Sequence, residues 1–94
     1  SDSDSDVRRA AAQSLGSLRD VRALAALEKA LMMDYEEEVR ASAAAAIAEL
    51  GEQAASVLPT LLKCAVEDEE KGVRYAAARA LLRALLAVLS SALE

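Results

Sequence analysis

The chain carries one segment three times: DVRRAAAQSLGSL at residues 6–18, EVRASAAAAIAELG at 38–51 and GVRYAAARALLRAL at 72–85. In each copy a Val-Arg pair is followed by Ala four residues after the Val and by Leu or Ile eight residues after it. Side chains at these spacings share one face of an α-helix, so each copy predicts a helix with an apolar stripe. The Val residues stand 32 and 34 residues apart, a period typical of stacked helix pairs. The three stripes are Val7, Ala11 and Leu15; Val39, Ala43 and Ile47; and Val73, Ala77 and Leu81.

Two apolar segments lie between these copies and complete the helix pairs. Because Pro59 lacks an amide hydrogen, the second segment either begins a helix just before Pro59 or kinks there. Gly51 and the acidic turns at 34–38 and 67–72 mark helix boundaries. The apolar positions at helical spacing are Val21, Leu24, Leu27 and Leu31 in the first segment, and Val57, Leu58, Leu61, Leu62 and Ala65 in the second. We therefore predict five helices, at residues 5–18, 20–32, 36–50, 53–66 and 71–92.

The composition predicts a single all-α domain over residues 1–94 with a thin core. Alanine dominates the apolar residues, Phe, Trp and His are absent, and Gly and Pro are rare. The net charge of −5 disfavours nucleic acid, whose phosphates need a basic surface. The acidic opening is unlike a secretory leader. Cys64, the single cysteine, is interpreted as a small core residue, and we expect a cytoplasmic protein.

The repeated pattern, an Asp five residues before each Val-Arg pair and alanines after it, resembles HEAT repeats, specifically the short kind found in phycobilin-lyase-like repeat proteins. The resemblance covers essentially the whole chain and implies an α-α superhelix, a HEAT-like solenoid of about five helices in roughly two and a half repeats. It also implies that the turn aspartates and second-helix arginines hydrogen-bond between adjacent repeats. These residues are Asp2, Asp34, Asp68, Arg8, Arg40 and Arg74. Repeats one and two keep the family's glycines, Gly16 and Gly51, whereas repeat three has Leu82 and Leu85 at those places.

No motif in the sequence supports catalysis or a cofactor. Asp2, Asp4 and Asp6 alternate as at the start of a calcium loop, but Val7 and Gln13 stand where that loop needs Gly and Glu, so an N-terminal cap is the better interpretation. The acidic clusters at 36–38 and 67–70 have no nucleophile or histidine beside them. Zinc lacks ligands and nucleotides lack a glycine-rich loop. We predict a protein that is not an enzyme and binds no cofactor, metal or small-molecule substrate.

The last helix carries more apolar side chains than one core face needs. We assign Leu81, Leu85, Val88 and Ala92 to the core, which leaves a second stripe. Only about ten residues near the C-terminus are largely apolar, too few to span a bilayer, so no membrane contact is expected. A natural array cut short would also leave such a surface, but subunit association is favoured. The predicted interface of a cyclic homo-oligomer consists of Ala41, Ala44, Ala48, Tyr75, Ala78, Leu82, Leu86, Leu89 and Leu93.

An alternative function is a monomeric adaptor that binds a protein or an acidic peptide on the concave face of the array. Its candidate residues project from second helices outside the core stripe: Arg9, Gln13, Tyr75 and Arg79. A third possibility, an enzyme or lyase subunit by analogy with the family, is not supported by any catalytic residues in the sequence. The alanine-rich, uncapped array and the final Leu-Glu also suggest an engineered surface on a natural HEAT-like scaffold.

Overall fold

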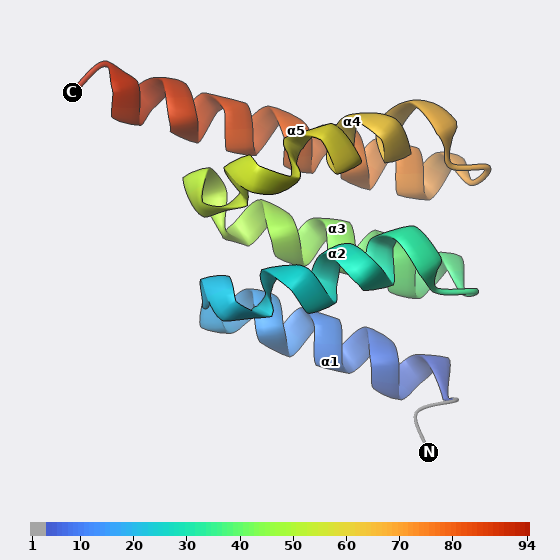
Figure 1. Cartoon of the computed structure of the whole chain (residues 1–94). Helices are drawn as coiled ribbons and strands as arrows, with labels where there is room; N and C mark the ends of the chain where they lie inside the picture. The colour runs from blue at the N-terminus through green and yellow to red at the C-terminus, as the bar shows by residue number, and fades with distance from the viewer. Residues whose placement is uncertain (1–3) are drawn as a thin grey trace.

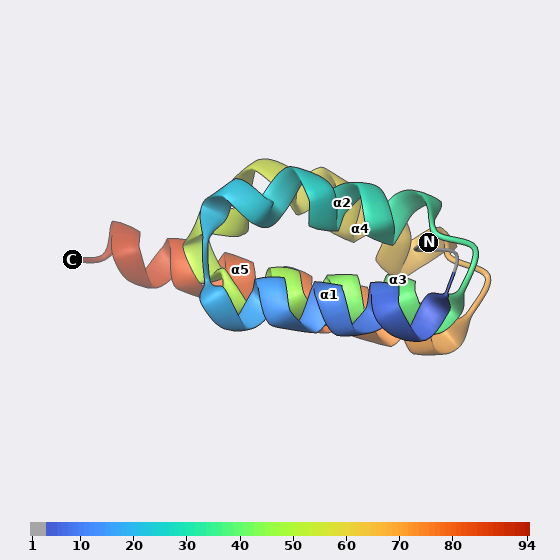
Figure 2. The ribbon, with the colours of Figure 1, turned by 90° about the horizontal axis from the view of Figure 1, so that it is seen from below.

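The structure, a computed structural model, describes residues 4–94 and stacks the helices in two layers (Figures 1 and 2). One layer holds α1 (Ser5–Leu18), α3 (Glu37–Glu49) and α5 (Lys71–Ala92), and the other holds α2 (Leu24–Met33) and α4 (Leu58–Glu67). Within the first layer α3 packs between α1 and α5, while α2 packs on α3 and α4 packs on α5. The chain is therefore the all-α superhelix that the sequence predicts.

The five helices lie where the sequence predicts them, with one difference at the start of each outer-layer helix. Short 3-10 segments, η1 (Val21–Ala23) and η2 (Gly51–Val57), precede α2 and α4. Pro59 occupies the first turn of α4, where its missing amide hydrogen has no intrahelical partner to lose. Of the two readings of Pro59, the helix start is confirmed and the kink is wrong.

Small residues set the distance between α1 and α3. Gly16 lies so close to α3 that a Cβ placed on it would stand 2.7 Å from both Cα and Cβ of Ala46. Ala12 on α1 and Ala43 and Ala44 on α3 are likewise buried. The larger core residues lie between the two layers, where the helices are further apart: Leu27, Leu31, Val39, Ile47, Leu61 and Val73. Alanine and glycine within the layer therefore give the thin core that the composition predicts.

Two of the predicted core stripes are partly wrong. Val7 and Ala11 on α1 are exposed and Leu15 is only half-buried, because within residues 4–94 no helix covers α1 as α2 covers α3. On α5 the buried face consists of Ala77, Ala80 and Ala84, whereas Leu85 is 41% exposed, Val88 is half-buried and Ala92 is exposed. Alanines form the buried face of α5 because only short side chains allow α5 to approach α3 closely. Val21 and Leu62, also assigned to core stripes, are exposed too.

Asp4 caps the start of α1. Its side chain accepts a hydrogen bond from the backbone N–H of Asp6 at 2.9 Å, which satisfies one of the free amide groups of the first turn. The N-terminal cap predicted for the alternating aspartates is confirmed for Asp4, while Asp2 lies outside the described residues.

The second half of α5 extends beyond the rest of the molecule (Figures 1 and 2). This 22-residue helix has a mean hydropathy of 1.3 over its most apolar window, so by length and composition alone it could cross a membrane. Its first half, however, is packed against α3 and α4, and Arg79 and Arg83 lie along it. Only 17% of that window is buried inside the fold, so packing in the repeat core accounts for a small part of its apolar character, and the apolar segment is longer than the ten residues counted from the sequence.

Gly16→Ala is expected to lower the free energy of unfolding by about 1–2 kcal/mol, because overpacking against Ala46 outweighs the better helix propensity of alanine. Urea unfolding followed by circular dichroism measures the change. Gly72→Ala is the matched control: a Cβ there meets nothing within 4 Å, so the free energy of unfolding should rise by roughly 0.5–1 kcal/mol. Effects of the same sign at both positions would contradict the close approach of α1 and α3.

Candidate interaction surfaces

Two arginines of the inner layer bind the turn aspartates of the following repeat. Arg8 on α1 donates from Nε to Oδ2 of Asp34 at 2.8 Å and from Nη2 to Oδ1 at 3.1 Å. Arg40 on α3 donates in the same two-pronged way to Asp68, at 3.0 and 3.2 Å. These side chains are at least three-quarters buried, so the paired geometry is held away from bulk water. The contact between repeats that the resemblance implies is thus confirmed for both pairs.

Each aspartate of these pairs also fixes its own turn. Oδ1 of Asp34 accepts the backbone N–H of Glu36, and Oδ1 of Asp68 accepts that of Glu70, both at 3.0 Å. Arg40 also contacts the turn that precedes its own helix, because its Nη1 donates to the backbone carbonyl of Asp34 at 2.9 Å. One carboxylate therefore joins a helix start to the preceding repeat.

The ion pairs lower the pKa of both aspartates. Hydrogen bonds from Arg8 hold the pKa of the Asp34 carboxyl below its ordinary value. For Asp68, burial acts to raise the pKa, but the hydrogen bonds from Arg40 and from the Glu70 amide outweigh it, and the net shift is downward. Both carboxylates are therefore charged at neutral pH.

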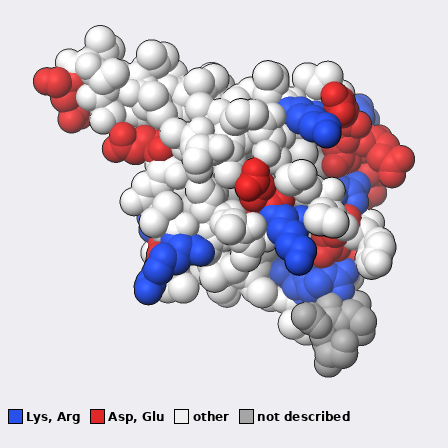
Figure 3. All heavy atoms as spheres, viewed as in Figure 1, with Lys and Arg blue, Asp and Glu red and all other residues white. Residues whose placement is uncertain are grey.

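The exposed side of α5 carries a row of apolar side chains, with Arg79 between its first two members. Its members are Tyr75, Leu82, Leu86, Leu89 and Leu93, and each is more than half exposed. Leu62 and Val66 of α4 are also exposed. In Figure 3 the charged side chains gather at the turns on the right, while the surface over the projecting end of α5 is largely uncharged. We call Leu82, Leu86, Leu89 and Leu93 the leucine stripe.

The alanines predicted to join this row in an interface do not reach the surface. Ala44 and Ala48 of α3 are fully buried, so their assignment to an oligomer interface is wrong. The reason is that α5 of the same chain packs on α3 and covers that side of it. Ala41 is half-buried and packs against the core, whereas Ala78, the position of α5 that corresponds to Ala44, is exposed.

The four candidate residues for peptide binding do not meet. Arg9 and Gln13 lie on α1, while Tyr75 and Arg79 lie on α5, with α3 between them. All four side chains are exposed, and Arg9 contacts Asp6 at 3.4 Å. They flank Ala45 of α3, which is exposed too. The arrangement is a broad face with small residues at its centre rather than a formed site.

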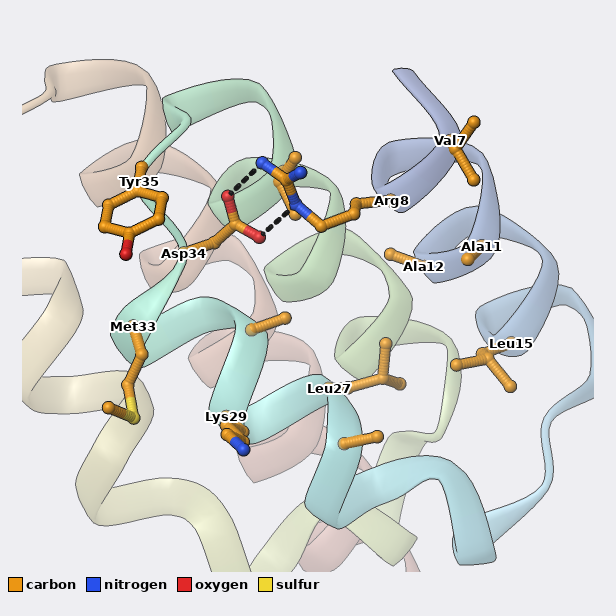
Figure 4. Close-up of a pocket in the computed structure, with 13 residues that line it drawn as sticks. Val7, Arg8, Ala11, Ala12, Leu15, Leu27, Lys29, Met33, Asp34 and Tyr35 are labelled. Carbon is orange, nitrogen blue, oxygen red and sulfur yellow. Dashed lines mark hydrogen bonds and ion pairs between the residues drawn. The ribbon is translucent and has the colours of Figure 1, made fainter. Parts of the chain in front are cut away.

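A groove between α1 and α2 is a surface that sequence reasoning missed. It has a volume of about 640 Å³ and is lined on the α1 side by Val7, Ala11 and Leu15. Figure 4 shows it between the two helices, with the Arg8–Asp34 pair at one end. From α2 and the turn after it come Ala26, Leu27, Lys29, Ala30, Met33 and Tyr35. Part of the signal was present in the sequence, since the α1 stripe matches the two buried stripes in its residue types and spacing.

The other polar groups singled out in the sequence lie at helix starts or against the core, where a structural role explains them. Glu37 and Glu70 lie at the starts of α3 and α5, and repulsion from Glu70 raises the pKa of Glu37. Cys64 is half-buried against the core, and burial raises the pKa of its thiol, as for a packing residue. Among residues 4–94, no three His, Cys, Asp or Glu side chains come together as a metal site would require.

The two-layer stack of helix pairs joined by Asp–Arg contacts defines an α-solenoid. The chain belongs to the HEAT-repeat family: the family model for HEAT repeats matches residues 1–48 and again residues 29–91. No curated protein sequence matches the chain significantly. HEAT-repeat proteins are generally non-enzymatic, and HEAT repeats suggest a helical-repeat scaffold or adaptor.

Asp34→Asn is expected to lower the free energy of unfolding at neutral pH by about 1–2 kcal/mol, because the amide keeps the turn cap but loses the charge that Arg8 binds. Chemical denaturation of both proteins measures the difference. Asp6→Asn is the control, since the Asp6–Arg9 pair is exposed and should contribute less than about 0.5 kcal/mol.

The same two proteins should differ in acid. Because the folded-state pKa of Asp34 is lowered, the folded protein binds fewer protons than the unfolded chain at acidic pH, around the folded and unfolded pKa values of this carboxyl. The stabilisation from Asp34 is therefore complete above the unfolded pKa of about 3.9 and is lost as the pH falls through the folded pKa. The free energy of unfolding should fall below about pH 4, and fall less steeply in Asp34→Asn. Parallel pH profiles for the two proteins would show that the pair does not stabilise the fold.

Proposed function

We propose that the protein is a non-enzymatic HEAT-repeat scaffold that assembles with itself through the leucine stripe of α5. The observation that carries the proposal is the exposure of this stripe along a helix that extends beyond its own fold. Its members follow a spacing of four, three and four residues, which is the spacing of a helix–helix seam. A second polypeptide covers such a seam by laying a helix along it.

The composition of the chain supports burial of this stripe in an assembly. With a net charge of −5 the chain is otherwise well suited to water, yet the four positions of the leucine stripe from Leu82 to Leu93 are all apolar and exposed. Contiguous apolar surface of this kind on a small protein marks an interaction site or an aggregation hazard. A closed, cyclic assembly removes the surface from water without open-ended growth.

The energy of the contact sets the concentration at which it forms. Burying the exposed part of each leucine contributes about 1–2 kcal/mol, so the stripe supplies on the order of 4–8 kcal/mol. Association itself costs at least about 4 kcal/mol in lost translational and rotational freedom. The stripe alone therefore leaves at most about 4 kcal/mol, which corresponds to association near roughly 1 mM chain. The apolar surface that is covered on the second molecule adds to this and extends the expected range toward tens of micromolar.

Leu86→Arg is expected to convert the assembly to a monomer while leaving the helical content unchanged, because Leu86 is exposed and takes no part in the core. Light scattering behind a sizing column measures the mass, and circular dichroism the fold. Ser91→Arg is the matched control, since Ser91 is exposed on the opposite side of the same helix and should leave the mass unchanged. A wild-type monomer throughout this concentration range would overturn the proposal.

Two other outcomes lead to different functions. A wild-type monomer that captures an acidic peptide, and loses it in Arg79→Glu, would favour the adaptor on the concave face. Co-sedimentation of the protein with lipid vesicles would favour a membrane role for α5, whose length and hydropathy permit one. Self-association is favoured over a membrane role because Ala77, Ala80 and Ala84 of α5 are buried within the fold, and because Arg79 and Arg83 place two charges within the apolar part of the helix.

A further inference from the structure

We propose that the partner of the leucine stripe is the groove over α1 of a second copy, so that the end of α5 from one molecule lies across Val7, Ala11 and Leu15 of the next. This inference rests on the proposed self-association through α5 and names the surface that receives it. The molecule thereby has one projecting apolar helix end and one open apolar groove, and each covers the other in a neighbouring copy.

The groove is the open counterpart of two contacts that the chain makes within itself. Val39, Ala43 and Ile47 on α3 occupy the same repeat positions as the groove residues, and they are 1%, 0% and 0% exposed because α2 lies over them. On α5, Val73, Ala77 and Leu81 hold these positions beneath α4, and all are buried or half-buried. On α1, Val7 is 54% exposed and Ala11 is exposed. The surface on α1 therefore has the chemistry of a helix-binding face and no helix in place within residues 4–94.

The end of α5 has the side-chain spacing of the helices that fill this position elsewhere. Helix α2 covers α3 with Leu24, Leu27 and Leu31, at positions i, i+3 and i+7, all of them buried. Helix α4 covers α5 with Leu58, Leu61 and Ala65 at the same spacing. Leu86, Leu89 and Leu93 repeat it, and they are more than half exposed. The same spacing of apolar side chains is thus present once more, and among residues 4–94 it is left exposed.

The two surfaces also agree in length. From Val7 to Leu15 the groove runs along α1 for about 12 Å, at about 1.5 Å of rise per residue. From Leu86 to Leu93 the three leucines cover about 10 Å of α5. Because this end of α5 projects past its own fold, it can enter a neighbour without unfolding any helix of its own molecule (Figure 1).

The charges at the ends of the groove favour one direction of entry. Helices α1 and α2 run antiparallel (Figure 2), and a helix that covers α1 as α2 covers α3 runs parallel to α2. Its carboxyl end then lies near Met33, where Lys29 lines the groove. The negative end of the α5 dipole and the Glu94 carboxylate meet the ammonium group of Lys29 in this direction.

Such a contact joins two different surfaces, so each molecule offers one α5 end and one groove. Head-to-tail contacts of this kind close into a ring when the rotation between copies allows it. A symmetric contact, in which two α5 helices cover each other, would not involve the groove. This difference provides the test.

The test uses two variants, each blocking one surface. Ala11→Arg fills the groove and keeps the leucine stripe, whereas Leu86→Arg breaks the stripe and keeps the groove. Each variant alone is expected to be a monomer by light scattering. An equimolar mixture is expected to form a heterodimer through the one intact pair of surfaces, and native mass spectrometry identifies one chain of each kind in it. Val7→Glu, at a second exposed groove position, should behave as Ala11→Arg does.

Controls and contrary outcomes are distinct. Ala10→Arg places the same charge on the neighbouring exposed residue of α1 outside the groove lining and should assemble like the wild type. If both groove variants are folded by circular dichroism and still assemble like the wild type, the groove is not the partner surface, and a symmetric α5 contact replaces it. Failure of the mixture to form a heterodimer overturns the inference as well. If the wild type is itself a monomer, the proposed function fails together with it.

Discussion

The bidentate contact from a helix arginine to the turn aspartate of the next repeat holds this fold in register. Arg8 binds Asp34 and Arg40 binds Asp68 with nearly the same geometry, and each aspartate also caps the turn in which it stands. Because the charged groups are mostly buried, a slip between repeats would leave a carboxylate without its partner in a poorly solvated place. The pairs therefore fix how far each helix pair is displaced from the one before it.

The alanine-rich helices stack in this register because their small side chains let them pack at short range. Gly16 against Ala46 shows the distance involved: a single added carbon atom would stand 2.7 Å from its neighbour. A layer built from such residues has little apolar volume of its own, and the larger side chains collect between the two layers. A stack of this design has apolar surface at both of its ends, since each repeat is built to contact another repeat.

Both ends of the stack accordingly carry the features on which function is proposed. At one end the face of α1 is an open groove, and at the other α5 continues past the fold with its leucine stripe exposed. The same apolar spacing that covers α3 and α5 inside the molecule recurs on the projecting end of α5. The proposed self-association would extend between copies the kind of contact that the repeats already make within one copy.

The sequence alone determined the repeat and the five helices, because helical periodicity and fixed spacing are local properties of a chain. The Asp–Arg pairs were implied by the resemblance to HEAT repeats. The sequence also identified the leucine stripe of α5. Only the tertiary structure decided which faces are covered. Ala44 and Ala48 share the pattern of exposed Ala78 and Leu82 but are buried, because α5 packs over them. Val7 and Ala11 share the pattern of a core stripe but line an open groove, because burial depends on a neighbouring helix that periodicity within one segment does not reveal.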